Sequence, residues 1–302
     1  MWLLGIAVVA LIFLYRWNRQ RQMLQNLTDK YVLITGCDSG FGNLLAKQLD
    51  KRGMQVLATC FTEKGAEDLK KETSSRLQTN ILDVTNSQNV KSVAKWVTKT
   101  VGNKGLWGLV NNSGSGGFFG PTEWQKKEDF SQVLEINLLG DGRIVNVSSA
   151  AGRLAIVGGG YCMSKYGVEA FSDNLRRELC HFGVKVSIIE PGAFKTAITN
   201  IDHYKHIMER LWENLTAEMK ESYGEKFLQQ YIQLVEGLVG ASSPKLNKVT
   251  DCMEHALTAA FPWTRYSPGW DCKLYFLPLS YLPTVMSDYL ICRSAPKPAP
   301  LN

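Results

Sequence analysis

The apolar run Tyr31-Val-Leu-Ile34 leads directly into Thr35-Gly-Cys-Asp-Ser-Gly-Phe-Gly42, and leucines at positions 44, 45 and 49 continue as a helical pattern. A strand, a glycine-rich turn and a helix in this order are the context that a dinucleotide-binding turn requires. Glycine lets the backbone approach a pyrophosphate, and a helix N-terminus offers unpaired N–H groups to the anion. An ordinary strand-to-helix turn is the alternative. The residues predicted to bind the dinucleotide are Gly36, Asp38, Ser39, Gly40, Phe41 and Gly42.

Strand and helix patterns alternate on the C-terminal side of this turn. Alternation of this kind predicts an α/β fold, a doubly wound parallel sheet of the Rossmann type with right-handed crossovers. Such sheets bind ligands at the carboxyl ends of their strands, where Asp83, Asn111, Ser149 and Pro191 fall. Strands are predicted at residues 31–35, 54–59, 77–82, 106–111, 143–147 and 185–190, and helices at 42–52, 63–72, 87–101, 122–139 and 161–182.

Tyr161 and Lys165 form a second motif, and Ser149 lies twelve residues before it. On a helix, residues four apart share one face. A nearby ammonium group stabilises phenolate, so Lys165 is expected to lower the tyrosine pKa from about 10. These residues predict that Tyr161 is a general acid/base and that Ser149 holds a substrate oxygen. Taken alone, a Tyr-x-x-x-Lys pair is more often a coincidence of the surface.

In their order along the chain, these motifs resemble the short-chain dehydrogenase/reductase family. The resemblance rests on the residues quoted above, on Leu82-Asp83-Val84, Asn111-Asn112-Ser113-Gly114 and Asn137, and on Glu190-Pro191-Gly192. Four further stretches, at residues 34–42, 158–162, 169–178 and 265–271, resemble the microsomal retinol dehydrogenase and 3α/17β-hydroxysteroid dehydrogenase branch of that family. This narrower likeness extends over nearly the whole chain.

The resemblance implies a membrane-associated oxidoreductase that transfers a hydride between NAD and a lipophilic alcohol, either retinol or a 3α/17β-hydroxysteroid. NADP is the less favoured cofactor, because Asp38 would repel a 2′-phosphate, although Lys64 could bind one. The implied location is the endoplasmic reticulum membrane. The implied catalytic residues are Tyr161, Lys165, Ser149 and Asn137, and the implied further cofactor contacts are Asp83, Asn111, Tyr161, Lys165, Pro191, Gly192 and Thr196.

Composition excludes several classes of protein. The net charge is +6, but the basic residues are dispersed, so no nucleic-acid partner is expected. Seven scattered cysteines and four isolated histidines suggest neither a disulfide framework nor a metal site. The predicted organisation is a membrane anchor with a basic flank (1–22), a dehydrogenase domain (23–272) with a helical substrate region (197–250), and an apolar C-terminal segment with a tail (273–302).

Both ends of the chain carry apolar segments. The run from Trp2 to Tyr15 is predicted to be a retained anchor, although it reaches only about 21 Å as a helix, against a hydrocarbon core of about 30 Å. Arg16 and Arg19 after it favour a cytosolic main domain without deciding the orientation. Residues 273–291 are interrupted by prolines, so they are interpreted as a lid, a membrane-surface contact or ordinary core.

One departure from the family concerns the connection before the fifth predicted strand. Asn137-Leu-Leu-Gly140 is followed by only Asp141 before Gly142-Arg-Ile-Val-Asn146, whereas family members carry roughly fifteen more residues there. Either the preceding helix slides and takes Asn137 away from Tyr161, or the strand that ends near Ser149 is displaced. A catalytically impaired form that binds cofactor without turnover is therefore the alternative function. The missing half-helix would also weaken a possible homodimer.

Overall fold

A parallel β-sheet forms the centre of the molecule. The structure is a computed structural model, and it describes residues 11, 14–15, 17–114, 142–156, 160–196, 199–293 and 295–298. In these residues the sheet has seven strands in the order β3-β2-β1-β4-β5-β6-β7, all paired in parallel. The strand order reverses between β1 and β4, where sheets of this type bind ligands. The strands are β1 (Tyr31–Ile34), β2 (Gln55–Cys60), β3 (Leu77–Ile81), β4 (Leu106–Asn111), β5 (Arg143–Val147), β6 (Lys185–Ile189) and β7 (Arg265–Tyr266).

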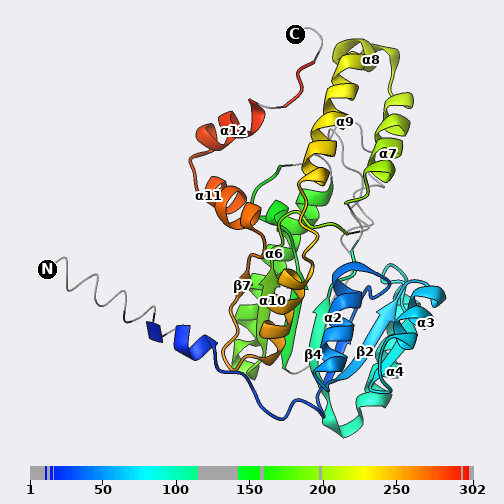
Figure 1. Ribbon diagram of the computed structural model, residues 1–302, viewed down its shortest axis with the longest axis vertical. Helices are drawn as coiled ribbons and strands as arrows, with labels where there is room; N and C mark the ends of the chain where they lie inside the picture. The colour runs from blue at the N-terminus through cyan, green and yellow to red at the C-terminus, as the bar shows by residue number, and fades with distance from the viewer. Residues whose placement is uncertain are drawn as a thin grey trace, which may run out of the picture.

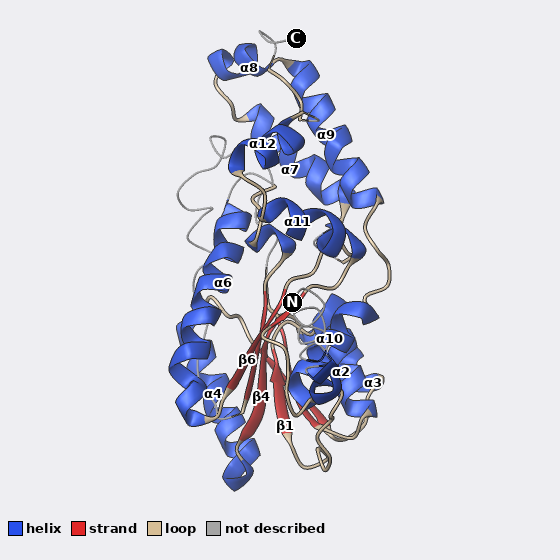
Figure 2. Cartoon of the chain, turned by 90° about the vertical axis from the view of Figure 1, so that its left-hand side faces the viewer, coloured by secondary structure: helices blue, strands red, loops and turns tan. Residues whose placement is uncertain are grey.

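Helices cover both faces of the sheet. Figure 2 shows α2, α3 and α10 on one side and α4 and α6 on the other. These helices are α2 (Gly40–Lys51), α3 (Glu63–Lys71), α4 (Ser87–Val101), α6 (Gly160–Leu179) and α10 (Asn247–Thr258).

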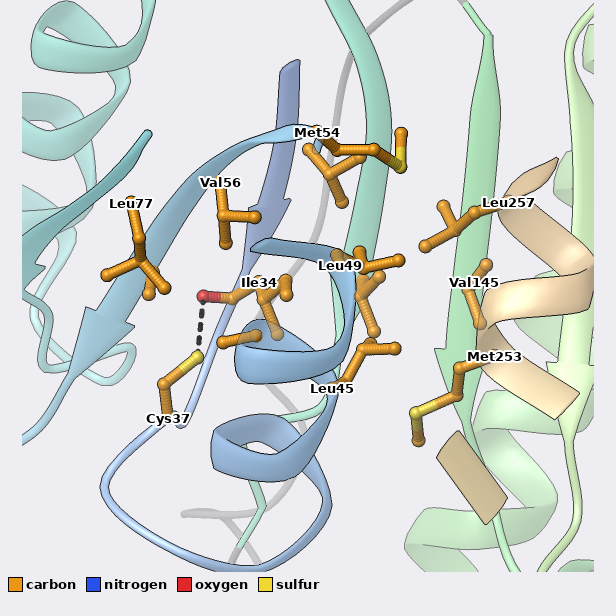
Figure 3. Close-up of a cluster of buried hydrophobic side chains, with 14 of the residues drawn as sticks. Ile34, Cys37, Leu45, Leu49, Met54, Val56, Leu77, Val145, Met253 and Leu257 are labelled. Atoms are coloured by element: carbon orange, nitrogen blue, oxygen red, sulfur yellow. Dashed lines mark hydrogen bonds between the residues drawn. The ribbon is translucent and has the colours of Figure 1, made fainter. Parts of the chain in front are cut away.

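The main hydrophobic core lies between β1, α2 and α10 (Figure 3). Leu45 and Leu49 of α2 are fully buried near Ile34 of β1 and near Met253 and Leu257 of α10. Burial of a side chain of this size stabilises a fold by about 1.5–3 kcal/mol. The core therefore fixes the start of α2, and with it the glycine-rich turn, against the sheet.

Three helices project beyond the sheet at the top of Figure 1, with their own apolar cluster around Met208 and Phe227. They are α7 (Ile201–Glu213), α8 (Ala217–Tyr223) and α9 (Glu225–Gly240). The chain then returns through α10 and β7 to a π-helical turn (Cys272–Phe276), α11 (Leu277–Ser280) and α12 (Thr284–Cys292). Helices thus fill most of the described part of the predicted helical region 197–250, whose role in substrate binding stays a prediction.

The fold class is confirmed, and the six predicted strands match β1 to β6 with ends that differ by one residue at most. The short β7 was not predicted. The helix predicted at residues 122–139 lies outside the described residues, as does Asn137. Among the residues that the structure describes, no helix is long and apolar enough to cross a bilayer; residues 1–10 of the predicted anchor are not among them.

β5 is in its place in the sheet despite the short connection before it. Asn111 of β4 pairs with Asn146 of β5, and Val147 of β5 pairs with Ile189 of β6. The expectation that β5 itself could be displaced is therefore wrong. Its hydrogen-bonded neighbours hold it on both sides.

Candidate active site

The glycine-rich turn forms a tight cradle at the carboxyl end of β1. Gly36 and Gly40 adopt φ angles of +72° and +65°, which favour glycine because a side chain would be strained there. A Cβ on Gly36 would come within 2.9 Å of the Cα of Ser113, and one on Gly42 would collide with the carbonyl oxygen of Gly36. These two glycines therefore let the turn pack closely on itself and on the segment after β4, at the N-terminus of α2, where a phosphate group would bind.

Asn112, which follows β4, braces this turn. Its Nδ2 donates hydrogen bonds to the carbonyl oxygens of Thr35 and Gly36, at 2.9 and 3.0 Å. The Thr35 hydroxyl accepts from the backbone N–H groups of Asn112 and Ser113, at 3.1 and 3.0 Å. No role in the site was predicted for Asn112 or Thr35. They could have been found by noting that β4 lies next to β1 in a sheet of this type. The residues that follow β4 then lie beside the turn that follows β1.

Asp38 ties the turn to the carboxyl end of β2. Its carboxylate accepts hydrogen bonds from the backbone N–H groups of Phe61 and Thr62, at 2.7 and 2.9 Å, and from the Thr62 hydroxyl at 2.7 Å. The Thr62 side chain in turn caps α3. A negative charge is therefore fixed at the point beyond β2 where dinucleotide-binding folds recognise the ribose.

Ser149, Tyr161 and Lys165 come together at the carboxyl end of β5. The Ser149 hydroxyl accepts from the N–H of Ala151 at 3.1 Å and is also hydrogen-bonded to the Tyr161 side chain. The Lys165 ammonium lies 5.7 Å from the centre of the Tyr161 ring and donates to the Val147 carbonyl at 3.1 Å. The structure thus brings together the three residues predicted to act together.

The electrostatics of this group differ from the sequence expectation. Burial raises the pKa of the Tyr161 phenol, and the hydrogen bond with Ser149 lowers it. Burial also lowers the pKa of Lys165 to about 8. The prediction that Lys165 lowers the pKa of Tyr161 is therefore not confirmed, because the net shift of that pKa is upward. The reason is that desolvation is the largest influence on both groups, while the ammonium is directed at the Val147 carbonyl.

The loop after β6 closes the other side of the site. The carbonyl of Pro191 accepts from the N–H of Ala150 at 2.9 Å, which joins this loop to the one that carries Ser149. Asp271 accepts from the N–H of Ala193 at 2.6 Å, and a Cβ on Gly192 would collide with the Asp271 carboxylate. Asp271 was not assigned a role from the sequence; it was noted only within the stretch 265–271.

Thr196 lies next to the glycine-rich turn. Its Cβ would be 3.9 Å from a Cβ placed on Gly40. Phe41 and Phe194 make an edge-to-face contact with ring centres 5.9 Å apart. The structure therefore brings together the turn and the loop after β6, as a shared dinucleotide site would require.

Two predicted cofactor residues have their polar groups engaged within the protein. The Asn111 amide donates to Asn146 at 2.9 Å, which links β4 to β5. The Asp83 carboxylate accepts from the N–H and hydroxyl of Thr85, at 2.9 and 2.7 Å, and these bonds lower the pKa of Asp83. Both residues lie at the predicted edge of the sheet, but their described contacts hold strands and turns together.

Comparison with known proteins gives the family. The family model for short chain dehydrogenases matches residues 30–141 and 139–205. Retinol dehydrogenase 7 of Rattus norvegicus is 55% identical over 314 aligned positions, with 99% of each chain covered. The 17-beta-hydroxysteroid dehydrogenase type 6 of Homo sapiens is 52% identical over 315 positions, again with 99% of each chain covered.

Solved structures agree on the fold. A short-chain dehydrogenase from Streptomyces avermitilis superposes with a TM-score of 0.65 at 24% identity, covering 87% of this chain and 96% of that one. Levodione reductase superposes with a TM-score of 0.64 at 23% identity, covering 83% of this chain and all of the other. At these identities the likeness concerns the fold alone.

The comparisons also locate the departure from the family. The two matched pieces of the family model meet at residues 139–141, and the alignment of 314 positions to the rat relative is longer than this chain of 302 residues. The missing segment between β4 and β5 is therefore confirmed. The chain belongs to the short-chain dehydrogenase family, in the branch of the retinol dehydrogenases and 17-beta-hydroxysteroid dehydrogenases, and by class it is an NAD(P)-dependent alcohol dehydrogenase.

Proposed function

We propose that this chain oxidises a lipophilic secondary or allylic alcohol, retinol or a 3α/17β-hydroxysteroid, with NAD, and catalyses the reverse reduction. The observation that carries the proposal is the Ser149–Tyr161 hydrogen bond beside Lys165, kept next to an intact glycine cradle. The relatives named as retinol and 17-beta-hydroxysteroid dehydrogenases support the substrate class.

Each residue of the group has a distinct role in this reaction. Ser149 orients the substrate hydroxyl, and Tyr161 accepts its proton while the bound nicotinamide supplies the hydride acceptor. The Lys165 cation stabilises the Tyr161 phenolate that accepts this proton, and the same phenolate forms again when Tyr161 donates the proton in the reverse reduction. Dinucleotide binding falls to the cradle of Gly36, Gly40 and Gly42. Asn137 remains a predicted fourth member of the group, outside the described residues.

A lipophilic substrate suits the surroundings of Tyr161. Tyr204 of α7 is 6% exposed, and its pKa is raised by burial and, to a smaller extent, by the neighbouring Tyr161. On the same helix, Met208 packs with Phe227 in the apolar cluster that joins α7 to α9. A ring system or polyene is expected to bury its surface against these helices, because removal of apolar area from water is favourable.

NAD is the proposed cofactor. The Asp38 carboxylate is held beyond β2 by three hydrogen bonds. A fixed negative charge there repels a 2′-phosphate and accepts hydrogen bonds from a ribose diol. NADP is therefore expected to bind more weakly than NAD.

Attachment to the endoplasmic reticulum membrane is proposed as well. Leu274, Tyr281, Val285 and Tyr289 in the C-terminal helices are 69–82% exposed. In Figure 1 α11 and α12 lie on the left of the molecule, the side on which the helical residues 17–20 also lie. Exposed aromatic and aliphatic side chains of this kind are typical of a membrane interface. An apolar substrate would reach the site from the same phase. A homodimer stays a prediction.

The test is NADH formation by membranes that contain the full-length chain, with retinol and with a 3α-hydroxysteroid as separate substrates. Tyr161→Phe is the matched control, because it removes only the phenol oxygen. We expect turnover in the unsubstituted chain, loss of at least a hundredfold in Tyr161→Phe, and NADH binding in both. NADH binding without turnover in the unsubstituted chain would refute the proposal in favour of an impaired, cofactor-binding form.

A further inference from the structure

Asp271 is a carboxylate from the C-terminal part of the chain that lies against the loop after β6. It directly precedes the π-helical turn Cys272–Phe276, yet its side chain makes no capping hydrogen bond to that turn. The carboxylate instead accepts a hydrogen bond of 2.6 Å from the backbone N–H of Ala193, which is 78 positions away in the chain. Hydrogen bonds to a charged acceptor are stronger than those between neutral groups. Asp271 therefore acts on the loop after β6 rather than on its own helix.

Two glycines make room for this carboxylate. A Cβ on Gly192 or on Gly269 would collide with it, so the carboxylate packs directly against the backbone of both residues. In the described part of the chain, no basic side chain forms a salt bridge with Asp271. Its hydrogen bond to Ala193 is therefore not a by-product of an ion pair.

Residues 191–193 are otherwise held by contacts of their backbone. These backbone–backbone hydrogen bonds run to Ala150, Pro268 and Ser243, at 2.9, 3.0 and 2.9 Å. Among the residues that the structure describes, Asp271 supplies the one side-chain hydrogen bond to this stretch. Because backbone bonds do not depend on residue type, Asp271 is the position at which the amino-acid sequence controls the stretch.

The segment around Asp271 is itself fixed on both sides. Before it, β7 pairs with β6. After it, Cys272 is fully buried, and its thiol donates to the Glu190 carbonyl at 3.3 Å. A side chain can position a neighbour accurately only when its own place is held by packing and hydrogen bonds. Asp271 meets this condition.

The loop after β6 runs from the catalytic group to the glycine-rich turn. Pro191 is hydrogen-bonded to the residue after Ser149, whereas Thr196 lies beside Gly40 of the turn. A dinucleotide with its pyrophosphate at the turn and its reactive ring at the catalytic group is therefore expected to place its nicotinamide half beside residues 191–193.

We propose that Asp271 is a positioning residue for the nicotinamide half of the cofactor: it fixes the backbone of residues 191–193 so that the ring is received beside Tyr161. This inference rests on the proposed function and deepens it. The role of Asp271 is indirect, because it acts through the backbone N–H of Ala193. The adenine half is expected at the other end of the site, beyond β2 with Asp38, and does not depend on Asp271.

The two halves of the cofactor can be separated by ligand. ADP-ribose lacks only the nicotinamide ring of the dinucleotide. Loss of a hydrogen bond to a charged group changes an equilibrium about tenfold, so Asp271→Ala should raise the Kd of NADH by about that factor. The Kd of ADP-ribose should stay the same. A merely structural role would lower the Tm and weaken both ligands alike.

The experiment titrates the full-length protein in detergent with NADH, followed by the fluorescence of NADH, and with ADP-ribose in competition. The measured quantity is the ratio of the two Kd values. Ser267→Ala is the matched control, because it removes another hydrogen bond of the same segment, from Oγ of Ser267 to Glu190 at 2.8 Å, which does not reach residues 191–193. We expect the ratio to change in Asp271→Ala and to stay constant in Ser267→Ala. An unchanged ratio in Asp271→Ala, or equal changes in both variants, would overturn the inference.

Asp271→Asn is a milder form of the same test. Its amide oxygen can still accept from Ala193, but a bond to a neutral acceptor is about half as strong, so the ratio should change about threefold. If Asp271→Ala does not fold, Asp271→Asn decides, and an unchanged ratio then overturns the inference. NADH formation by the unsubstituted chain separates the two proposals. A changed ratio without turnover refutes only the proposed function, and turnover with an unchanged ratio refutes only the role of Asp271.

Discussion

Asn112→Ala isolates the brace that holds the glycine-rich turn. The substitution removes the two hydrogen bonds from Nδ2 to the carbonyls of Thr35 and Gly36, at 2.9 and 3.0 Å. Each such bond contributes about 0.5–1.5 kcal/mol net, so we expect a loss of about 2 kcal/mol in the free energy of unfolding. For a chain of 302 residues that is a fall in Tm of roughly 3 °C. The affinity for NADH should also fall several-fold, because the Gly36 carbonyl is no longer fixed.

Asn43→Ala is the matched control for this prediction. Asn43 donates a single hydrogen bond to the same turn, from Nδ2 to the Cys37 carbonyl at 3.0 Å. Its loss should therefore cost about half as much stability. The assay is thermal unfolding of the full-length protein in detergent, followed by tryptophan fluorescence, with NADH titrated in parallel. If Asn112→Ala lowers Tm no more than Asn43→Ala, or leaves NADH affinity unchanged, the brace is not what positions the turn.

The remaining predictions concern stability, cofactor choice and membrane contact. Gly167→Ala should stabilise the protein by about 0.5–1 kcal/mol, measured as a rise in Tm, because this α6 position has nothing within 4 Å of a new Cβ. Leu257→Ala should cost about 2–5 kcal/mol, because the side chain is fully buried against α2; a fall in Tm of less than 2 °C would contradict this. Asp38→Asn should raise the ratio of kcat/KM with NADP to that with NAD at least fivefold. Val285→Asp should weaken retention of the protein by membranes in carbonate or high salt, and full retention would argue that α12 does not touch lipid.

Local patterns predicted most of the fold. Apolar runs and turn residues gave β1 to β6 and their helices, because each strand or helix carries its own periodicity. The same reasoning missed Asn112 and Asp271, whose hydrogen bonds reach residues 76–78 positions away in the chain. It also missed β7, a two-residue strand that exists only because β6 offers it a partner. Such contacts arise from tertiary structure, and no local pattern encodes them.

The position of Ser149 follows from the neighbours of β5 rather than from the length of chain that leads into it. Arg143 at the start of β5 is buried, and its guanidinium donates to the Ala259 carbonyl at 2.9 Å after α10. At the other end, Asn146 joins β5 to β4 through Asn111 and to α6 through Ser172. These bonds fix the strand at both ends, so a shorter crossover need not move Ser149. The shorter crossover is therefore expected to affect activity through the position of Asn137 and through the surface that the missing half-helix would have covered.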